Sequence, residues 1–600
     1  MELSAAWIVL AVIVFLVILL YTEWLRPAIS FMIALLVLVV GNEFTADNNL
    51  LTAQEALSGF ANEQLAIIVL LLIMGAIFEK TKVISVLFRG LFSGKSQRSF
   101  LAKLTGVVGV SSAFLNNTPL VAMFMPSVYN WARERGLSPS KFLIPLSYAS
   151  ILGGCATLIG TSTNLIASGL AVQYGEAPLA IFDFAPVGVV MLVLGMLFLL
   201  ILGPRLLPDY KGNVEQLMEA RQYFLETQVK VGSPLIGQSV EAAGLRNLQG
   251  MFLVEIIRGD SMIRPVSPGE LLEEGDELYL AGNPESIADL TQPKLGLSLP
   301  KACNIPLRET SDVVEVVIAH NSRLVGKKVK NSDFRGRYDG AILAIHRNGE
   351  KLWGKIGELT LRSGDVLLVL TGKDFFVRTR NNPAFYVISK PAVVNHVELG
   401  KTLVLTLGML AAIALAVLGW VSLFVSLSVL LVLCLLMRIT HPAEIRNKID
   451  FNLVFIIAAG LGIGQAMNNS GAAALISEHF LSLSGSLGVL GILAALFLVT
   501  NLLSAFLTSK AAVSLVIPVA ISLVQGLSAT HPELTVTPFI LVVAFGGAAN
   551  FLTPIGYQTN LMVYGPGGYK FKDFLRIGAP LTLLYLVVCV FILGWQFDLY

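Results

Sequence analysis

The stretch SSAFLNNTPLVAMFMP (residues 111–126) is apolar at both ends and is interrupted by a polar triplet at residues 116–118. A second stretch, SAFLTSKAAVSLVIP (residues 504–518), has the same form, with its polar triplet at residues 508–510. In lipid an unsatisfied backbone group is costly, so a helix broken at membrane depth must be covered by protein or by a water-filled cavity. The two interruptions therefore predict a transporter built from two repeats, with a binding site where the repeats meet.

The composition places most of the chain in a lipid bilayer. Of its 600 residues 55% are hydrophobic and 14% are charged, and the mean hydropathy is +0.74. A soluble protein carries roughly 25% charged residues. The net charge of +2 does not suggest a nucleic-acid partner. The sequence has neither a Walker loop nor a dinucleotide fingerprint after a strand, so we expect a protein that is not an enzyme and is not driven by ATP.

Apolar runs long enough to cross a bilayer occur in both halves of the chain. They lie near residues 4–22, 28–45, 65–80, 142–170 and 187–204, and again near 400–418, 421–437, 452–468, 536–563 and 579–597. The two interrupted stretches form hairpins between these runs, near residues 104–130 and 487–525. The expected fold is a polytopic α-helical membrane protein with about five spans and one re-entrant hairpin in each half.

Basic residues orient these runs, because short cytoplasmic loops hold an excess of Lys and Arg. The loop at residues 80–103 and the segment after the first hairpin are both basic, so this hairpin is predicted to enter from the cytoplasm. Lys510 is the only Lys or Arg between Lys448 and Lys570, so the second hairpin is predicted to enter from outside. The two halves are therefore expected to be inverted, with both chain ends outside.

Dense charges and strand-like alternation between residues 208 and 390 predict a soluble insertion. It contains an internal repeat, in which the residues of the first copy recur 89 positions later. The first copy holds Leu235, Gly237, Val240, Gly275 and Asp276, and the second holds Leu324, Gly326, Val329, Gly364 and Asp365. We expect two small α+β domains at 222–292 and 312–380, on the cytoplasmic side between membrane repeats at 1–207 and 396–600.

Each hairpin is followed by a span with a further polar break, at residues 160–164 (GTSTN) and 553–560 (TPIGYQTN). Gly and Pro in these breaks free backbone carbonyls, and hydroxyls and amides add neutral oxygens. Such oxygens suit a small hard cation such as Na⁺, whereas helix N-termini offer N–H groups to an anion. The alternative is that small polar residues let helices pack closely. Four breaks in a repeat-related pattern favour a binding site.

Lys510 places a cation at membrane depth, which is costly and indicates a function. Three interpretations stay open. The ammonium pairs with a bound anion, or it stands where the other half of the chain holds a sodium ion. In the third, the side chain extends from a shallow hairpin tip to the interface.

The membrane part resembles the divalent-anion/sodium symporter family, whose members carry dicarboxylates, citrate or sulfate. The resemblance rests on five motifs: ALSGFANEQ (56–64), FLNNTPLVAMFMP (114–126), IGTSTNL (159–165), AAGLGIGQAMNNSG (458–471) and TPIGYQTNLMVYGPGGY (553–569). In that family each hairpin tip carries Ser-Asn-Thr, and each unwound turn contributes a glycine to sodium binding. Here the first tip has Asn in place of Ser, and the second tip, Thr508-Ser509-Lys510, differs from the pattern.

The resemblance implies which residues bind sodium and which bind the substrate. For the first sodium site they are Asn116, Asn117 and Gly160, and for the second they are Thr508 and Gly556. For the substrate they are Asn117, Thr118, Thr161, Ser162, Ser509, Lys510, Tyr557, Gln558 and Thr559.

The function we expect is secondary active import of a small divalent anion, sulfate or a similar oxyanion, with Na⁺ as the coupling ion and with no cofactor. The alternatives are a dicarboxylate symporter, or a cation channel or exchanger gated by the soluble domains. The resemblance implies a homodimer with an elevator-type motion, in a bacterial inner membrane. The soluble repeats resemble the TrkA-C (RCK C-terminal) domain, found in the sulfate-permease-like branch, so they either sense a small regulatory ligand or form a dimerisation platform.

Overall fold

The structure is a computed structural model, and it describes most of the chain between residues 5 and 599. The described residues are 5–22, 25, 27–44, 49–78, 96–210, 224–245, 251–259, 261–263, 266–282, 297, 301–302, 313–319, 322–347, 350–352, 356–372, 374–379, 384–387, 399–442, 445, 449, 451–484, 487–528 and 531–599. Most of the basic loop at 80–103 lies outside them, as do the four bounds predicted for the soluble domains.

The first half of the membrane part consists of apolar helices and one hairpin. Its helices are α1 (Ala5–Thr22), α2 (Pro27–Glu43), α3 (Ala53–Ser58), α4 (Glu63–Phe78), α6 (Gln97–Ser112), α7 (Asn117–Glu134), α8 (Leu143–Gly154), α9 (Ser162–Gln173), α10 (Ala185–Ile201) and α11 (Gly203–Leu206). The helices α6 and α7 make up the expected hairpin. The run predicted at 142–170 is divided into α8 and α9 at its polar break.

The second half of the membrane part also consists of apolar helices and one hairpin. Its helices are α16 (Leu399–Val417), α17 (Leu423–Leu436), α19 (Phe451–Asn469), α20 (Ala472–Ser484), α21 (Gly488–Phe506), α22 (Ser509–Leu527), α23 (Thr537–Ala548), α24 (Gln558–Tyr564) and α25 (Phe571–Gln596). The hairpin is α21 with α22, and the broken span is α23 with α24. The apolar runs of the sequence do not predict α20, because Ser477, Glu478 and His479 interrupt its run.

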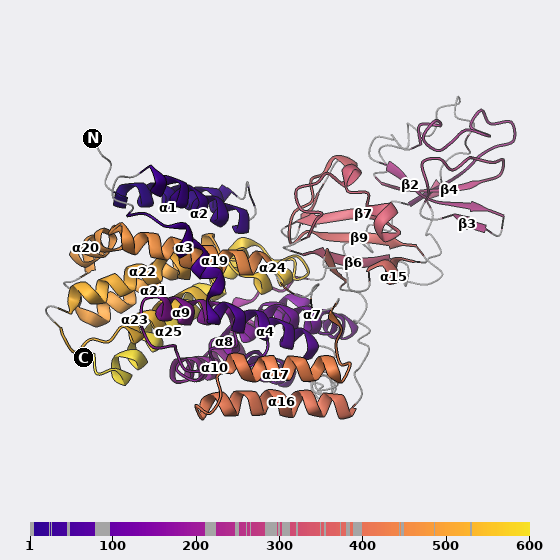
Figure 1. Ribbon diagram of the computed structural model, residues 1–600. Helices are drawn as coiled ribbons and strands as arrows, with labels where there is room; N and C mark the ends of the chain where they lie inside the picture. The colour runs from indigo at the N-terminus through magenta and orange to yellow at the C-terminus, as the bar shows by residue number, and fades with distance from the viewer. Residues whose placement is uncertain are drawn as a thin grey trace.

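Seven helices among the described residues are long and apolar enough to cross a membrane. Four shorter apolar helices, α2, α10, α17 and α23, accompany them. The helix of the second hairpin, α22, has 72% of its most apolar window buried, whereas the corresponding value for α16 is 22%. The chain is therefore a mostly helical, multi-pass membrane protein in which α22 is central and α16 lies at the edge (Figure 1).

The insertion between the two halves folds into two antiparallel sheets with the same strand order. The strands are β1 (Phe224–Gln228), β2 (Met251–Arg258), β3 (Ser261–Ile263), β4 (Glu277–Gly282), β5 (Lys301–Ala302), β6 (Val313–Ile318), β7 (Gly340–Arg347), β8 (Glu350–Lys351), β9 (Val366–Thr371) and β10 (Phe385–Val387). The first sheet has the order β3-β2-β4-β1-β5, and the second has the equivalent order β8-β7-β9-β6-β10. An irregularity in register between Leu253 and Glu255 recurs between Ile342 and Ala344, 89 positions later.

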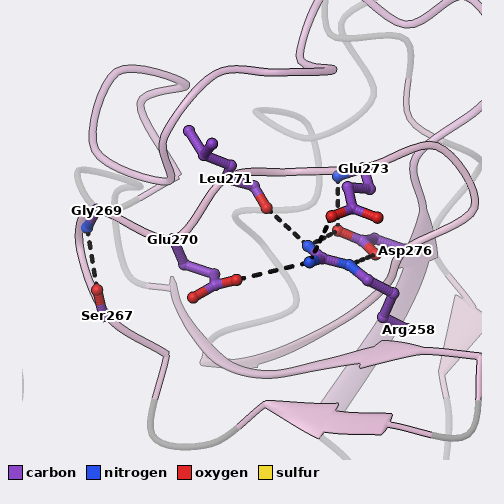
Figure 2. Close-up of polar contacts among 7 residues, drawn as sticks. All are labelled: Arg258, Ser267, Gly269, Glu270, Leu271, Glu273 and Asp276. Atoms are coloured by element: carbon purple, nitrogen blue, oxygen red, sulfur yellow. Dashed lines mark hydrogen bonds and ion pairs between the residues drawn. The ribbon is translucent and has the colours of Figure 1, made fainter.

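Each sheet also contains the same internal ion pair. Arg258 binds Asp276 through two nitrogens, at 2.8 and 2.9 Å (Figure 2). Arg347 binds Asp365 in the same way, at 2.7 and 2.8 Å. Both aspartates are fully buried, so the bidentate arginine compensates the cost of burying each carboxylate. The repeated Gly-Asp dipeptides of the sequence are thus the turns that precede β4 and β9.

Candidate functional site

The first hairpin turns at the polar triplet identified in the sequence. Asn116 caps α7, and its side-chain oxygen accepts a hydrogen bond from the Thr118 amide at 3.4 Å. Asn117 is 1% exposed, and its Oδ1 accepts a hydrogen bond from Ser112 at the end of α6. The tip is therefore a polar turn with one buried amide, Asn117, at the start of an 18-residue helix.

The second hairpin has the same construction with different side chains. Thr508 caps α22, and its hydroxyl accepts a hydrogen bond from the Ala511 amide at 3.2 Å. Ser504 donates to the Ser509 hydroxyl at 3.1 Å. This contact matches the one from Ser112 to Asn117, because in both hairpins the donor precedes the acceptor by five residues.

The two unwound segments are held against the hairpins by matching contacts. Thr157 donates to the carbonyl of Ala113, and Thr553 donates to the carbonyl of Ala505. Three residues after each threonine, a glycine amide donates back to its hydroxyl: Gly160 at 3.1 Å and Gly556 at 3.2 Å. The equivalent residues of the two segments are 396 positions apart, so both breaks have the same local structure.

Glycine is required in both segments because other atoms approach it closely. A methyl group at Gly160 would lie 2.5 Å from the carbonyl oxygen of Gly154, and one at Gly556 would lie 2.2 Å from Asn550 Nδ2. We expect Gly160→Ala and Gly556→Ala each to destabilise the protein by about 1–3 kcal/mol, because the packed segments must move apart. The measurement is the melting temperature of the purified protein in detergent. Gly75→Ala is the control, since within the described residues its methyl group would meet nothing within 4 Å outside its own helix. Unchanged melting of both site variants would contradict the prediction.

One buried amide side chain lies on the hairpin in the first half of the chain and on the unwound segment in the second half. In the first half the amide is on the hairpin, at Asn117, and it lies against Gly154 of the opposite segment. The residue 396 positions after Gly154 is Asn550, and there the hairpin carries the smaller Ser509. Asn550 Nδ2 donates to the backbone and side-chain oxygens of Ser504, at 2.8 and 2.9 Å. Each half therefore keeps one buried amide between its hairpin and its unwound segment.

Two buried asparagine side-chain oxygens lack a hydrogen-bond donor within the described part of the chain: Asn550 Oδ1 and Asn164 Oδ1. The Nδ2 atoms of both residues donate to backbone oxygens, which fixes the orientation of the amides. An unpaired buried polar atom costs about 1–3 kcal/mol. These two oxygens can therefore serve as cation ligands. Sequence analysis did not assign a role to either residue, although comparing the two halves residue by residue places Asn550 opposite Gly154.

Side chains from both halves meet at the first hairpin tip. The Nδ2 of Asn117 donates to the Tyr557 hydroxyl at 2.6 Å, and that hydroxyl lies 3.3 Å from the Thr161 hydroxyl. Thr118 donates to Gln558 Oε1 at 2.9 Å. The structure thus brings together five of the residues expected to bind substrate. We call Asn117, Thr118, Thr161, Tyr557 and Gln558 the crossing cluster.

The other expected site residues lie at the second hairpin tip and at the starts of α9 and α24. Ser509 and Thr508 belong to the second hairpin tip, and Lys510 is the half-buried second residue of α22. Ser162 begins α9 and is half-buried. Thr559 is fully buried and accepts a hydrogen bond from Ser147 at 2.8 Å, so it joins α24 to α8. Thr559 is therefore not a member of the crossing cluster.

Curated proteins that resemble the chain are named as transporters or as a sulfur-response protein. An uncharacterized transporter of Synechocystis is 33% identical over 96% of this chain and 94% of its own length. A putative sulfur deprivation response regulator of Chlamydomonas reinhardtii is 33% identical over 90% of this chain and 94% of its own. Sodium/sulfate cotransporter 1 of the same alga is 23% identical over 96% of this chain and 88% of its own.

A family model described as a citrate transporter matches residues 16–546. The match includes both hairpins, the first unwound segment and the whole insertion. The chain therefore belongs to the CitMHS family of citrate transporters.

Proposed function

We propose that the chain is a secondary active transporter that imports a small divalent anion, sulfate or a similar oxyanion, together with sodium. The observation that carries this proposal is the crossing cluster, in which uncharged polar side chains from both halves meet where α7 begins. Hydroxyl and amide donors at a helix N-terminus suit an anion, because the helix end carries a partial positive charge. Relatives named sodium/sulfate cotransporters support the choice of anion.

Sodium is proposed to bind beside each hairpin tip, on amide and carbonyl oxygens. Small hard cations prefer such oxygen ligands. The first position is formed by Asn116, Asn117 and the backbone near Gly160. The second is formed by Thr508 and the backbone near Gly556, and Asn550 supplies the amide oxygen that the second tip lacks. The buried, donor-free Oδ1 of Asn550 supports this assignment.

The proposed architecture is a pair of inverted repeats with two TrkA-C-like domains inserted between them on the cytoplasmic side. The contacts that recur 396 positions apart support the repeats, and the equal strand orders of the two sheets support the paired domains. A homodimer with an elevator-type motion, in a bacterial inner membrane, completes the proposal. Motion of α7, α9, α22 and α24 as one unit would carry both hairpin tips across the membrane.

Dicarboxylate or citrate transport is the second candidate, because the family is described as one of citrate transporters. Carboxylates and sulfate use the same hydroxyl and amide donors, so the crossing cluster suits both. The two candidates differ in the size of the anion that the crossing cluster must accommodate.

The test is uptake of labelled sulfate and labelled succinate into proteoliposomes, with and without an inward sodium gradient. We expect sulfate uptake that rises several-fold with the gradient, because sodium and the anion enter together. Sodium-driven succinate uptake without sulfate uptake would select the second candidate. Electrogenic cation flux without uptake of either anion would contradict both and favour a gated channel or exchanger.

A further inference from the structure

The second soluble sheet contacts the far end of the helix that begins at the first hairpin tip. Glu315 of β6 is 4% exposed and accepts a hydrogen bond from the Tyr129 hydroxyl of α7. Arg133, one turn further along α7, acts on the same carboxylate by its charge. Burial raises the pKa of Glu315, while Tyr129 and Arg133 partly offset this rise. A carboxylate buried in this way is stabilised only while α7 supplies its partners.

The same sheet also contacts the end of α24, the short helix that follows Tyr557 of the crossing cluster. A methyl group on Gly565, the residue after α24, would lie 2.5 Å from Val366 and 2.6 Å from the carbonyl oxygen of Gly364. Val317 of β6 and Val366 of β9 belong to the same apolar cluster as the membrane helices. Figure 1 shows β6 and β9 beside α24.

We infer that the second sheet is a clamp that sets the affinity of the candidate site by holding the ends of α7 and α24. Both helices begin at the crossing cluster and end at this sheet. The seven residues of α24 span about 10 Å, so a displacement at its end reaches Gln558 directly. Affinity depends on holding the binding groups in place before the ligand arrives, because ordering them costs free energy. Any ligand or partner that displaces the sheet would therefore change anion binding, and by reciprocity anion binding would change docking of the sheet.

The first test measures amide hydrogen exchange in α7 and α24, in protein without any anion. The amide of Leu120 bonds to the Asn116 carbonyl at 3.4 Å, and that of Leu561 bonds to the Tyr557 carbonyl at 3.2 Å. Both hydrogen bonds lie at the crossing cluster, so their exchange with deuterium reports opening of the site. Gly565→Ala inserts a methyl group between α24 and the sheet. In Gly565→Ala we expect exchange at both amides to become at least about fivefold faster, because fivefold is the lower end of the change in affinity that coupled sites usually produce.

Two conservative variants weaken the contact between α7 and the second sheet instead. Tyr129→Phe removes the hydroxyl that Glu315 accepts from, and Glu315→Gln removes the buried charge. We expect both to accelerate exchange at Leu120 while peptides of α9, which packs against α22, α23 and α4, keep their rate. Gly75→Ala is again the control. Exchange at Leu120 and Leu561 that stays at its original rate in all three folded variants would overturn the inference.

The second test rests on the proposed function, because it uses sulfate uptake. We expect the KM for sulfate to rise at least about fivefold in Gly565→Ala and Glu315→Gln, with a smaller change in the maximal rate. A fall in KM would overturn the inference, since the sheet would then restrain the site instead of supporting it. If the original protein takes up no sulfate, the proposed function fails. The exchange experiment still decides the clamp, because it needs no transported anion.

Discussion

Asn550→Ala is expected to remove the rise in melting temperature that sodium produces and to lower sodium-driven uptake roughly tenfold to hundredfold. Asn550 Nδ2 is fixed by Ser504, and this leaves the buried Oδ1 free to bind a cation. Losing an interaction with a charged group costs about 1.5–3 kcal/mol, and each 1.4 kcal/mol is a factor of ten. The measurements are melting in detergent with increasing sodium and no anion, and uptake into proteoliposomes.

The control is Asn501→Ala, which removes a nearby amide with a structural contact. Asn501 Nδ2 donates to the carbonyls of Gly546 and Ala549, at 2.9 and 2.8 Å. We expect this variant to melt at a lower temperature and to keep its response to sodium. An Asn550→Ala protein that keeps the full sodium response would show that the amide is only structural.

A rescue experiment uses the difference between the two halves. Combining Ser509→Asn with Asn550→Gly gives the second half the pair that Asn117 and Gly154 form in the first. We expect the double variant to regain part of the sodium response, because the amide returns to the same space from the hairpin side. Asn550→Gly alone should stay unresponsive. A double variant no better than Asn550→Gly would mean that the two positions are not equivalent.

The positions of the hairpins and breaks could be predicted because their signals are local. Asn116 and Thr508 are residues that favour helix N-caps, and each stands between two apolar runs, so α7 and α22 begin where the polar triplets lie. Gly160 and Gly556 mark the breaks because neighbouring atoms, the Gly154 backbone and the Asn550 side chain, leave no room for a side chain there. The family resemblance implies that Tyr557 and Gln558 bind the substrate, and the structure places both beside the first hairpin tip.

Contacts between distant segments could not be predicted from local patterns. Asn117 and Tyr557 are 440 positions apart, and nothing in either segment specifies that their side chains meet. The proposed role of Asn550, in the unwound segment, depends on the small size of Ser509 at the start of α22. Docking of Glu315 against Tyr129 joins the insertion to the membrane part, and a buried glutamate in a strand does not identify its partner. Hairpin position and the repeat within the insertion follow from the sequence, whereas the strand order and the assembled site need the tertiary structure.

Lys510 is proposed to bind the transported anion directly. It is the second residue of α22, where the helix end carries a partial positive charge that disfavours a cation by about 0.3–1 kcal/mol. A bound divalent anion would reverse this penalty, and in low dielectric its attraction to an ammonium is much stronger than in water. The proposed second sodium site consists of Thr508, Asn550 and the backbone near Gly556, so the ammonium need not replace the second ion.

Lys510→Met keeps much of the side-chain length and removes the charge, and we expect it to weaken anion affinity about a hundredfold, the size of losing a charged hydrogen bond. Lys510→Arg should retain part of the affinity, because the charge remains. Anion affinity is measured as the KM for sulfate, and the sodium response as the melting shift without anion. If the ammonium binds the anion, the melting shift with sodium persists in Lys510→Met. If the ammonium instead replaces a sodium ion, the number of sodium ions transported per anion changes in Lys510→Met. Normal uptake by Lys510→Met, with unchanged sodium dependence, would show that the side chain only extends from the hairpin tip to the interface.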